Sequence, residues 1–187
     1  MRAFIGIDLD EAARHELLAL GESVRAAVPS WRDEKWVAAQ NLHLTLRFLG
    51  EIESASIDPL SQALTAQLSE YPAFELSCLD PLEAVPGPRR ARMLWTRYDD
   101  PEERCSRLVR TMDESLLAFG ILPEARPFVP HVTLVRARRT RPFPNPEGLS
   151  STLRETVSVR EVTLFSSVLG RSGPNYDRVA RIALDMR

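Results

Sequence analysis

The sequence predicts an α+β fold in which antiparallel or mixed sheets form two similar lobes. Segments with helix and strand periodicity are interspersed along the chain, and several strand segments have one polar face. The tetrapeptide H-L-T-L at residues 43–46 recurs as H-V-T-L at residues 131–134, within a similar order of elements. Neither G-x-G-x-x-G nor G-x-x-x-x-G-K-[ST] occurs, so the sequence does not indicate the common dinucleotide-binding and P-loop folds.

The first half of the chain predicts two helices among its strands. The first helix is capped by Asp8 or Asp10 and ends at Pro29, and the second follows Ser54 or Asp58. Their apolar residues recur at helical spacing, whereas the strand segments are short and end at Gly or Pro. The expected elements are strands at 2–9, 36–38, 42–49 and 74–79 and helices at 13–27 and 57–71.

The second half predicts one long helix, which begins at Pro101 behind a capping Asp99 or Asp100 and ends at Gly120. Proline-rich stretches at 81–88 and 142–148 indicate loops, and a short helix is expected after the second of them. The expected strands are 91–98, 131–135, 157–169 and 178–184, with a turn at 170–175.

Composition places the chain among ordinary globular proteins. It has 187 residues, 44% hydrophobic and 27% charged, which predicts one domain over residues 1–187. No apolar run is long enough for a membrane span. The first acidic residue is already Asp8, so there is no apolar signal-peptide core, and we expect a cytoplasmic protein. Cys78 and Cys105 lie in apolar patterns and are expected to be buried small hydrophobes rather than a disulfide or a metal site.

The repeated tetrapeptide places polar groups on one face of two strands. Residues i and i+2 of a strand share a face, so His43 and Thr45 point one way. By the same alternation Phe48 points to the opposite, apolar face and is expected in the core. The second copy repeats the arrangement with His131 and Thr133.

Two imidazoles facing one groove suit acid–base chemistry at phosphorus. Imidazole titrates near neutral pH, so one ring can protonate a leaving oxygen while the other deprotonates water. The hydroxyls of Thr45 and Thr133 can donate to phosphoryl oxygens as charge develops on them. The H-x-T spacing lacks the further His or carboxylate expected of a zinc site, so no metal is predicted.

The segments HLTLRFLGE and PHVTLVRAR closely resemble the two motifs of the two-histidine (2H) phosphoesterase superfamily. Within it, they are most similar to the bacterial and archaeal RNA 2′,3′-cyclic phosphodiesterases, also known as 2′-5′ RNA ligases. The resemblance extends over nearly the whole chain, through residues 2–7, 90–95 and 173–176.

The resemblance implies a bilobal fold with outer helices and the two histidines facing each other across a central cleft. It implies hydrolysis of 2′,3′-cyclic phosphates to 2′-phosphates without a cofactor, by a monomer acting on RNA 3′ ends, tRNA fragments among them, or cyclic nucleotides. His43 would be the proton donor and His131 the proton acceptor, with Thr45, Thr133 and Arg136 binding the substrate. Family members can also join RNA ends through a 2′-5′ bond without ATP.

Four details remain open in the sequence. Strict alternation puts Arg136 on the face opposite His131, unless a bulge intervenes or the strand ends at Val135. Arg47 fits either the groove or a solvated strand end. Tyr176 is expected to fix a turn rather than contact the cleft. The arginines at 136–141 fit either a path for an RNA backbone or a solvated loop.

Two other functions are compatible with the same motifs. The groove could bind a nucleotide or RNA end without turnover, or the enzyme could act on an ADP-ribose cyclic phosphate. In an apparently symmetric groove the residues alone do not choose which histidine is the acid, so that assignment rests on the resemblance.

Overall fold

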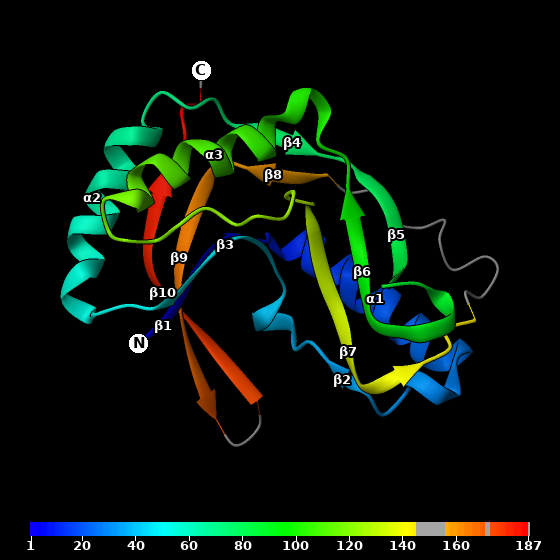
Figure 1. The fold of residues 1–187 in the computed structure, drawn as a ribbon. Coiled ribbons are helices and arrows are strands. Elements are labelled where there is room, and N and C mark those ends of the chain that lie inside the picture. The colour runs from blue at the N-terminus through cyan, green and yellow to red at the C-terminus, as the bar shows by residue number, and fades with distance from the viewer. Residues whose placement is uncertain (145–155, 171–172, 187) are drawn as a thin grey trace.

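The computed structural model describes residues 1–144, 156–170 and 173–186. Three α-helices are interspersed among ten strands along these residues, as the sequence predicts for an α+β protein (Figure 1). The helices are α1 (Glu11–Ala27), α2 (Ile57–Leu68) and α3 (Arg104–Leu117). The strands are β1 (Arg2–Asp8), β2 (Lys35–Trp36), β3 (His43–Glu51), β4 (Phe74–Leu76), β5 (Cys78–Val85), β6 (Ala91–Tyr98), β7 (His131–Arg141), β8 (Val157–Val159), β9 (Glu161–Gly170) and β10 (Gly173–Ala183).

One large antiparallel sheet runs through the molecule in the order β10-β9-β1-β3-β7-β6-β5, with β2 beside β7. Its two central strands, β3 and β7, pair only through Leu44 and Val132. This narrow junction divides the sheet into lobe 1 (β10, β9, β1 and β3) and lobe 2 (β7, β6, β5 and β2). The predicted bilobal arrangement is therefore confirmed, and the two repeated tetrapeptides lie at the junction.

The two lobes are built on one repeated unit. In β1–α1–β3 and again in β6–α3–β7, a helix connects two strands that pair antiparallel. Each helix packs on the lobe that does not hold its strands: Gly21 of α1 lies against Trp36 of β2, and Asp113 of α3 binds Arg47 of β3. In Figure 1, α3 accordingly lies beside α2, and α1 is seen behind β6 and β7.

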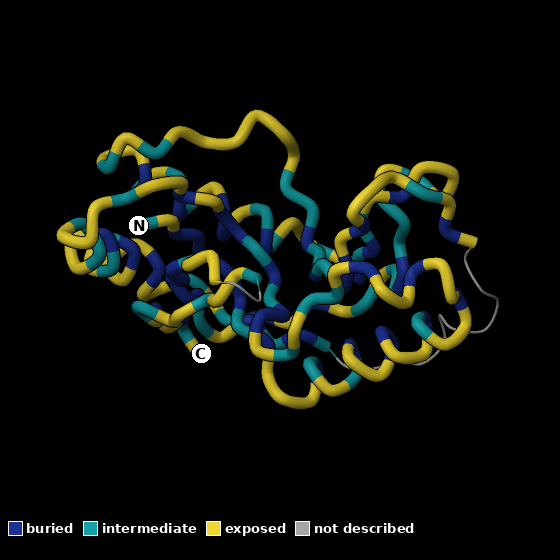
Figure 2. Tube along the Cα trace, turned by 90° about the horizontal axis from the view of Figure 1, so that it is seen from below, coloured by how far each residue is buried: buried dark blue, intermediate teal, exposed yellow. Residues whose placement is uncertain are grey.

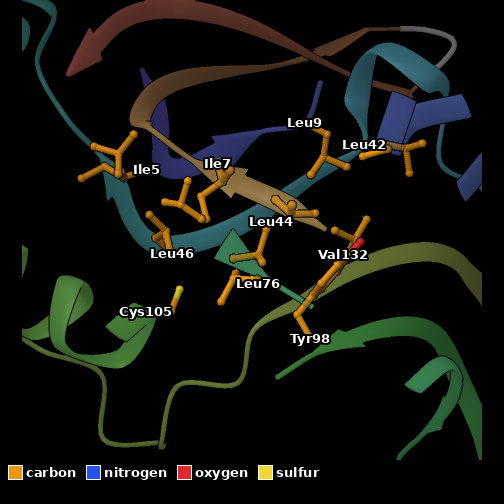
Figure 3. Packing of buried hydrophobic residues seen from close by; sticks show 14 of the residues in the cluster. Ile5, Ile7, Leu9, Leu42, Leu44, Leu46, Leu76, Tyr98, Cys105 and Val132 are labelled. Atoms are coloured by element: carbon orange, nitrogen blue, oxygen red, sulfur yellow. The ribbon is translucent and has the colours of Figure 1, made fainter. Parts of the chain in front are cut away.

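The hydrophobic core continues from one lobe into the other. Leu44 and Val132, which join the lobes, are fully buried among Ile7, Leu76 and Tyr98 (Figure 3). Figure 2 shows buried residues along the inner strands and exposed residues on the outer faces of the helices and loops. The shared core fixes the two H-x-T strands relative to each other, because neither can move without opening it.

Several helix boundaries follow from side-chain caps. Asp10 accepts a hydrogen bond from the backbone N–H of Ala13, as predicted for α1. Asp100 accepts from the N–H groups of Cys105 and Ser106 and so caps α3. The helix nevertheless begins at Arg104 and not at Pro101, because a short 3₁₀ turn with left-handed backbone precedes it.

Four predicted segments are wrong in extent. Residues 81–85 belong to β5 and not to a loop; β5 is an edge strand with irregular pairing, where a proline is tolerated. The predicted strand 157–169 is broken at Arg160 into β8 and β9, and β7 continues to Arg141. Part of the predicted turn at 170–175 belongs to β10, and the short helix expected after 142–148 lies outside the described residues. None of the described helices is long and apolar enough to cross a membrane.

Candidate active site

A cleft of about 1210 Å³ lies where the two lobes meet. His43 and Thr45 reach it from β3, and His131 and Thr133 reach it from β7. All four side chains are half-buried, whereas the apolar residues between and after them are buried on the other face. Arg136 also lines the cleft, so the structure brings together all five residues named from the sequence.

Both H-x-T strands contain a β-bulge at the same place in the motif. On β3, Leu46 is the extra residue opposite β1, and on β7, Leu134 is the extra residue opposite β6. A bulge shifts the alternation of faces by one residue. It therefore returns Arg136 to the face of His131, which is the first of the two ways that we expected alternation to be broken.

The same bulge overturns the prediction for Phe48. Its side chain is not in the core but 59% exposed, and it lines the cleft. Arg47 is not at a solvated strand end but lines the cleft, the other of its two expected places, as a buried and paired group. It is only 3% exposed, binds Asp113 at 2.6 Å and Glu124 at 3.0 Å, and donates to the carbonyl of Leu122.

Matching hydrogen bonds orient the two imidazoles. The His43 Nδ1 lies 2.7 Å from the carbonyl oxygen of Asn41, and the His131 Nδ1 lies 2.8 Å from that of Val129. A carbonyl can only accept, so Nδ1 carries the proton in each ring. The Nε2 atoms are left for chemistry. That of His43 lies 2.9 Å from the Thr45 hydroxyl.

Burial favours the neutral form of both rings. It lowers the pKa of His43 to about 4, assisted by the positive charge of Arg136 and by His131, while the bond to Asn41 and the Asp8 carboxylate oppose the shift. The pKa of His131 is also lowered, first by burial and then by Arg136 and Arg97. Arg136 thus acts on both rings, and a bound anion that neutralises it will raise both pKa values.

Aromatic side chains hold the rings in place, a role that the sequence did not predict for any of them. Trp95 of β6 stacks on His131 with ring centroids 3.8 Å apart. Phe4 of β1 packs on His43 at 4.7 Å, and Tyr176 of β10 meets the same imidazole edge-on at 5.1 Å. Tyr176 therefore contacts the cleft, and its expected role in a turn is wrong. Only the register of the sheet could reveal these contacts, since no local pattern marks them.

The arginine run on β7 is divided between two roles. Arg138 and Arg141 bind the buried carboxylate of Glu34, which attaches the segment before β2 to β7. The run lies on β7, so the alternative of a solvated loop is wrong, and of the four arginines only Arg136 and Arg139 lack a carboxylate partner among the described residues.

The remaining candidate chemistries are not supported. Burial raises the pKa of the Cys78 thiol to about 11 and raises that of Cys105 further, so neither is poised as a nucleophile. Within the described residues, no cluster of three His, Cys, Asp or Glu side chains is placed to hold a metal. The bilobal fold with paired H-x-T strands instead defines a two-histidine phosphoesterase.

Comparison with known proteins agrees with this class. Residues 16–170 match the model of the 2′-5′ RNA ligase superfamily. The RNA 2′,3′-cyclic phosphodiesterase of Methanothermobacter thermautotrophicus is 31% identical over 183 residues, which are 94% of this chain and 95% of the relative. The chain belongs to the 2′-5′ RNA ligase superfamily.

Solved structures show the same fold. The protein TT0787 of Thermus thermophilus superposes with a TM-score of 0.78 at 25% identity and covers 98% of each chain. Escherichia coli LigT, complexed with 3′-AMP, superposes with a TM-score of 0.77 at 27% identity, covering 98% of this chain and 97% of LigT.

Proposed function

We propose that this protein is an RNA 2′,3′-cyclic phosphodiesterase that hydrolyses 2′,3′-cyclic phosphate ends to 2′-phosphates. The observation that carries the proposal is the pair of imidazoles in one cleft, each with Nδ1 bound to a carbonyl and Nε2 left for proton transfer. The name of the relative from Methanothermobacter and the nucleotide bound to LigT support an RNA-like substrate.

The reaction needs one proton taken and one given. His131 Nε2 accepts a proton from water as the water oxygen forms a bond to phosphorus. The bond from phosphorus to the 3′ oxygen breaks, and His43 Nε2 gives its proton to that oxygen. The products are a 2′-phosphate and a 3′ hydroxyl. If the 5′ hydroxyl of a second RNA replaces water in the same steps, the product is a 2′-5′ phosphodiester with a free 3′ hydroxyl, which accounts for 2′-5′ ligation; the reverse of these steps cleaves that bond.

Three side chains bind the phosphate in this scheme. Thr45 and Thr133 donate their hydroxyls to the non-bridging oxygens, and Arg136 supplies a positive charge that no described carboxylate neutralises. The anion in turn favours the protonated form of His43, whose pKa in the free protein is about 4. Substrate binding therefore creates the acid that the reaction needs.

The strand partners of the two histidines support this division of roles. On β1, Asp8 lies opposite His43, and on β6, Arg97 lies opposite His131. The carboxylate favours the imidazolium form of His43, whereas the guanidinium disfavours that of His131. Burial outweighs both, but the two charges differ in sign, in the direction expected for an acid and a base.

We further propose that the chain acts as a monomer and as one bilobal domain over residues 1–187. Both lobes that form the cleft come from one chain and share one core. The natural substrates would be RNA 3′ ends, including those of tRNA fragments, or cyclic nucleotides. The free thiols of Cys78 and Cys105 suit a reducing compartment such as the cytoplasm.

The test is incubation of the purified protein with an oligonucleotide that ends in a 2′,3′-cyclic phosphate, followed by phosphorus NMR. None of the proposed steps uses a metal ion, so we expect a 2′-phosphate in the presence of EDTA. A 3′-phosphate would reverse the leaving group and the two histidine roles. Binding of a 2′-nucleotide without any turnover would show a binding module, and turnover of only an ADP-ribose cyclic phosphate would show a different esterase.

A further inference from the structure

A basic surface extends from the cleft over the outer end of lobe 2. Residues 84–98 and 125–146, which contain β6 and β7, hold nine arginines and no acidic residue. The beginning of β6, the second half of β7 and β2 lie together at this end of the sheet (Figure 1). Six exposed cations there have no carboxylate partner among the described residues, and we call them the basic strip: Lys35, Arg89, Arg90, Arg92, Arg136 and Arg139.

The strip begins at the cleft with two cations side by side. Arg136 lines the cleft, and Lys35 of β2 lies directly opposite it across the strand pair. Residues directly opposite each other share a face of the sheet, where like charges repel and destabilise the pairing. A bound anion relieves this repulsion, so the pair favours a phosphate at this point.

Backbone contacts continue the strip away from the cleft. The guanidinium of Arg92 donates to the backbone carbonyl of Arg138 at 2.9 Å, which places it beside the second half of β7. The N–H of Phe143 donates to the carbonyl of Pro88 at 2.7 Å, and this bond holds Arg89 next to the end of β7. The cations thus form one continuous surface and not three separate groups.

The side of the cleft formed by α3 has the opposite electrostatic character. Residues 100–128 line it with four carboxylates, those of Asp100, Glu103, Asp113 and Glu124. Only three cations accompany them: Arg110, which pairs with Glu103; Arg47, which pairs with Asp113 and Glu124; and Arg126. A polyanion is therefore attracted toward the basic strip and not toward α3.

We propose that the RNA chain on the 5′ side of the cyclic phosphate leaves the cleft over lobe 2, with its phosphates on the basic strip. The inference rests on the proposed function and deepens it, because it gives the RNA a path and a direction. Guanidinium and ammonium groups bind phosphates of any sequence, so the strip adds affinity without base preference. A cyclic mononucleotide has no further phosphate and does not reach the strip beyond Arg136.

The experiment compares adenosine 2′,3′-cyclic phosphate with an RNA of about ten nucleotides that ends in the same group, a length typical of single-strand binding sites. We expect the triple variant Arg89→Gln, Arg90→Gln, Arg139→Gln to lower kcat/KM for the RNA by about 10-fold or more at low salt and to leave the mononucleotide unchanged. Each lost phosphate contact changes the slope of log kcat/KM against log salt by about 0.7, so the slope for RNA should become less steep by about 2.

The matched control is the triple variant Arg2→Gln, Arg107→Gln, Arg160→Gln, which removes the same charge from exposed positions that do not line the cleft. It should keep both the RNA rate and the slope. An equal loss in the two triple variants, an unchanged slope, or an equal loss on the mononucleotide would overturn the path while leaving the phosphodiesterase intact.

Failure of the unmodified protein on both substrates would instead overturn the proposed function. Fluorescence anisotropy with an RNA that ends in a 2′-phosphate tests the strip without turnover. The variant that lacks Arg89, Arg90 and Arg139 should bind this RNA about 10-fold or more weakly than the control variant at low salt, and equal affinities refute the proposal.

Discussion

The strands β3 and β7 carry the same chemistry in different surroundings. Each presents His and Thr to the cleft, holds Nδ1 with the carbonyl two residues earlier, and bulges at the motif leucine. Around β3 the neighbours are aromatic rings and the Asp8 carboxylate. Around β7 they are an indole and the guanidinium groups of Arg97 and Arg136.

The two copies of the repeated unit are equal in backbone and unequal in their neighbouring side chains. The backbone of the motif fixes where the two proton-transfer groups lie, and it does so equally in both lobes. The residues on the neighbouring strands then decide which group is easier to protonate and which part of the substrate lies beside it. Four sets of substitutions test this division. They begin with the two motif histidines and end with the charged residues on the neighbouring strands.

Removing either imidazole should have the largest effect. His43→Ala and His131→Ala each remove a proton-transfer group, so we expect kcat to fall by about 10²- to 10⁴-fold. His15→Ala, on the exposed side of α1, is the control and should keep the wild-type rate. Circular dichroism checks that each variant is folded, and a wild-type rate in either cleft variant would exclude that histidine from the chemistry.

A modified substrate separates the two roles. If sulfur replaces the 3′ oxygen, the leaving thiolate needs no proton, since a thiol has a pKa of about 8.5. This substrate should restore the rate of His43→Ala but not that of His131→Ala. Rescue of His131→Ala alone would mean that the acid and the base are exchanged.

At Arg47 the two lobes differ in a buried ion pair, which affects the stability of the fold, and not in a proton-transfer group. The counterpart of Arg47 after the β7 bulge is Val135, which is fully buried. Arg47→Val makes lobe 1 resemble lobe 2 but leaves the Asp113 carboxylate, which is 14% exposed, without its partner. Loss of one partner of a buried ion pair costs about 3–5 kcal/mol, so urea unfolding should show a destabilisation of this size.

The double variant Arg47→Val, Asp113→Leu is the control for this explanation. It removes both charges and should recover most of the lost stability, since an apolar pair of similar volume often replaces a buried ion pair without cost. If the double variant is no more stable than Arg47→Val, then an unpaired Asp113 is not the cause. Glu124, the other partner of Arg47, is exposed and contributes little.

The sequence could predict what depends on local pattern. Helix periodicity and capping aspartates located α1 and α3, and alternation placed His43 and His131 on one face of their strands. Alternation holds only as far as Thr45 and Thr133, because the bulge comes directly after them. The position of a bulge depends on the partner strand, so the residues of one strand alone do not predict it.

The failures at the site lie beyond this point or depend on distant partners. Phe48 was expected in the core because the bulge at Leu46 was not anticipated. The pairing of Arg138 and Arg141 with Glu34 joins residues about a hundred positions apart, which no spacing rule relates. The family resemblance placed Arg136 beside the phosphate where alternation did not, since related folds share their bulges.

Arg136 lowers the pKa of the motif histidine in each lobe. Its removal should therefore lower kcat/KM and raise both pKa values. We expect Arg136→Gln to lower kcat/KM about 10-fold or more, because a charged hydrogen bond to phosphate is worth about 1.5–3 kcal/mol. The same change removes a positive charge that lowers the pKa of His43 and of His131, so both pKa values should rise. The acidic limb of the pH profile of kcat/KM, which reports the free enzyme, should therefore move to higher pH.

Arg139→Gln is the matched control on the same strand, since Arg139 is exposed and does not line the cleft. With a cyclic mononucleotide as substrate, this variant should change neither kcat/KM nor the position of the acidic limb of its pH profile. A loss of rate in Arg136→Gln without a displaced limb would mean that the guanidinium binds substrate but does not set the protonation of the histidines.

The smallest effects should come from the strand partners, and they test the direction of the cleft most closely. Asp8→Asn removes a carboxylate that favours protonated His43, so the pKa of His43 should fall. Arg97→Gln removes a cation that disfavours protonated His131, so the pKa of His131 should rise. Titration of the imidazole C–H signals by NMR measures both without substrate. Shifts of opposite sign mean that neighbouring charges polarise a symmetric pair; shifts of the same sign, or none, leave burial alone to distinguish the two rings.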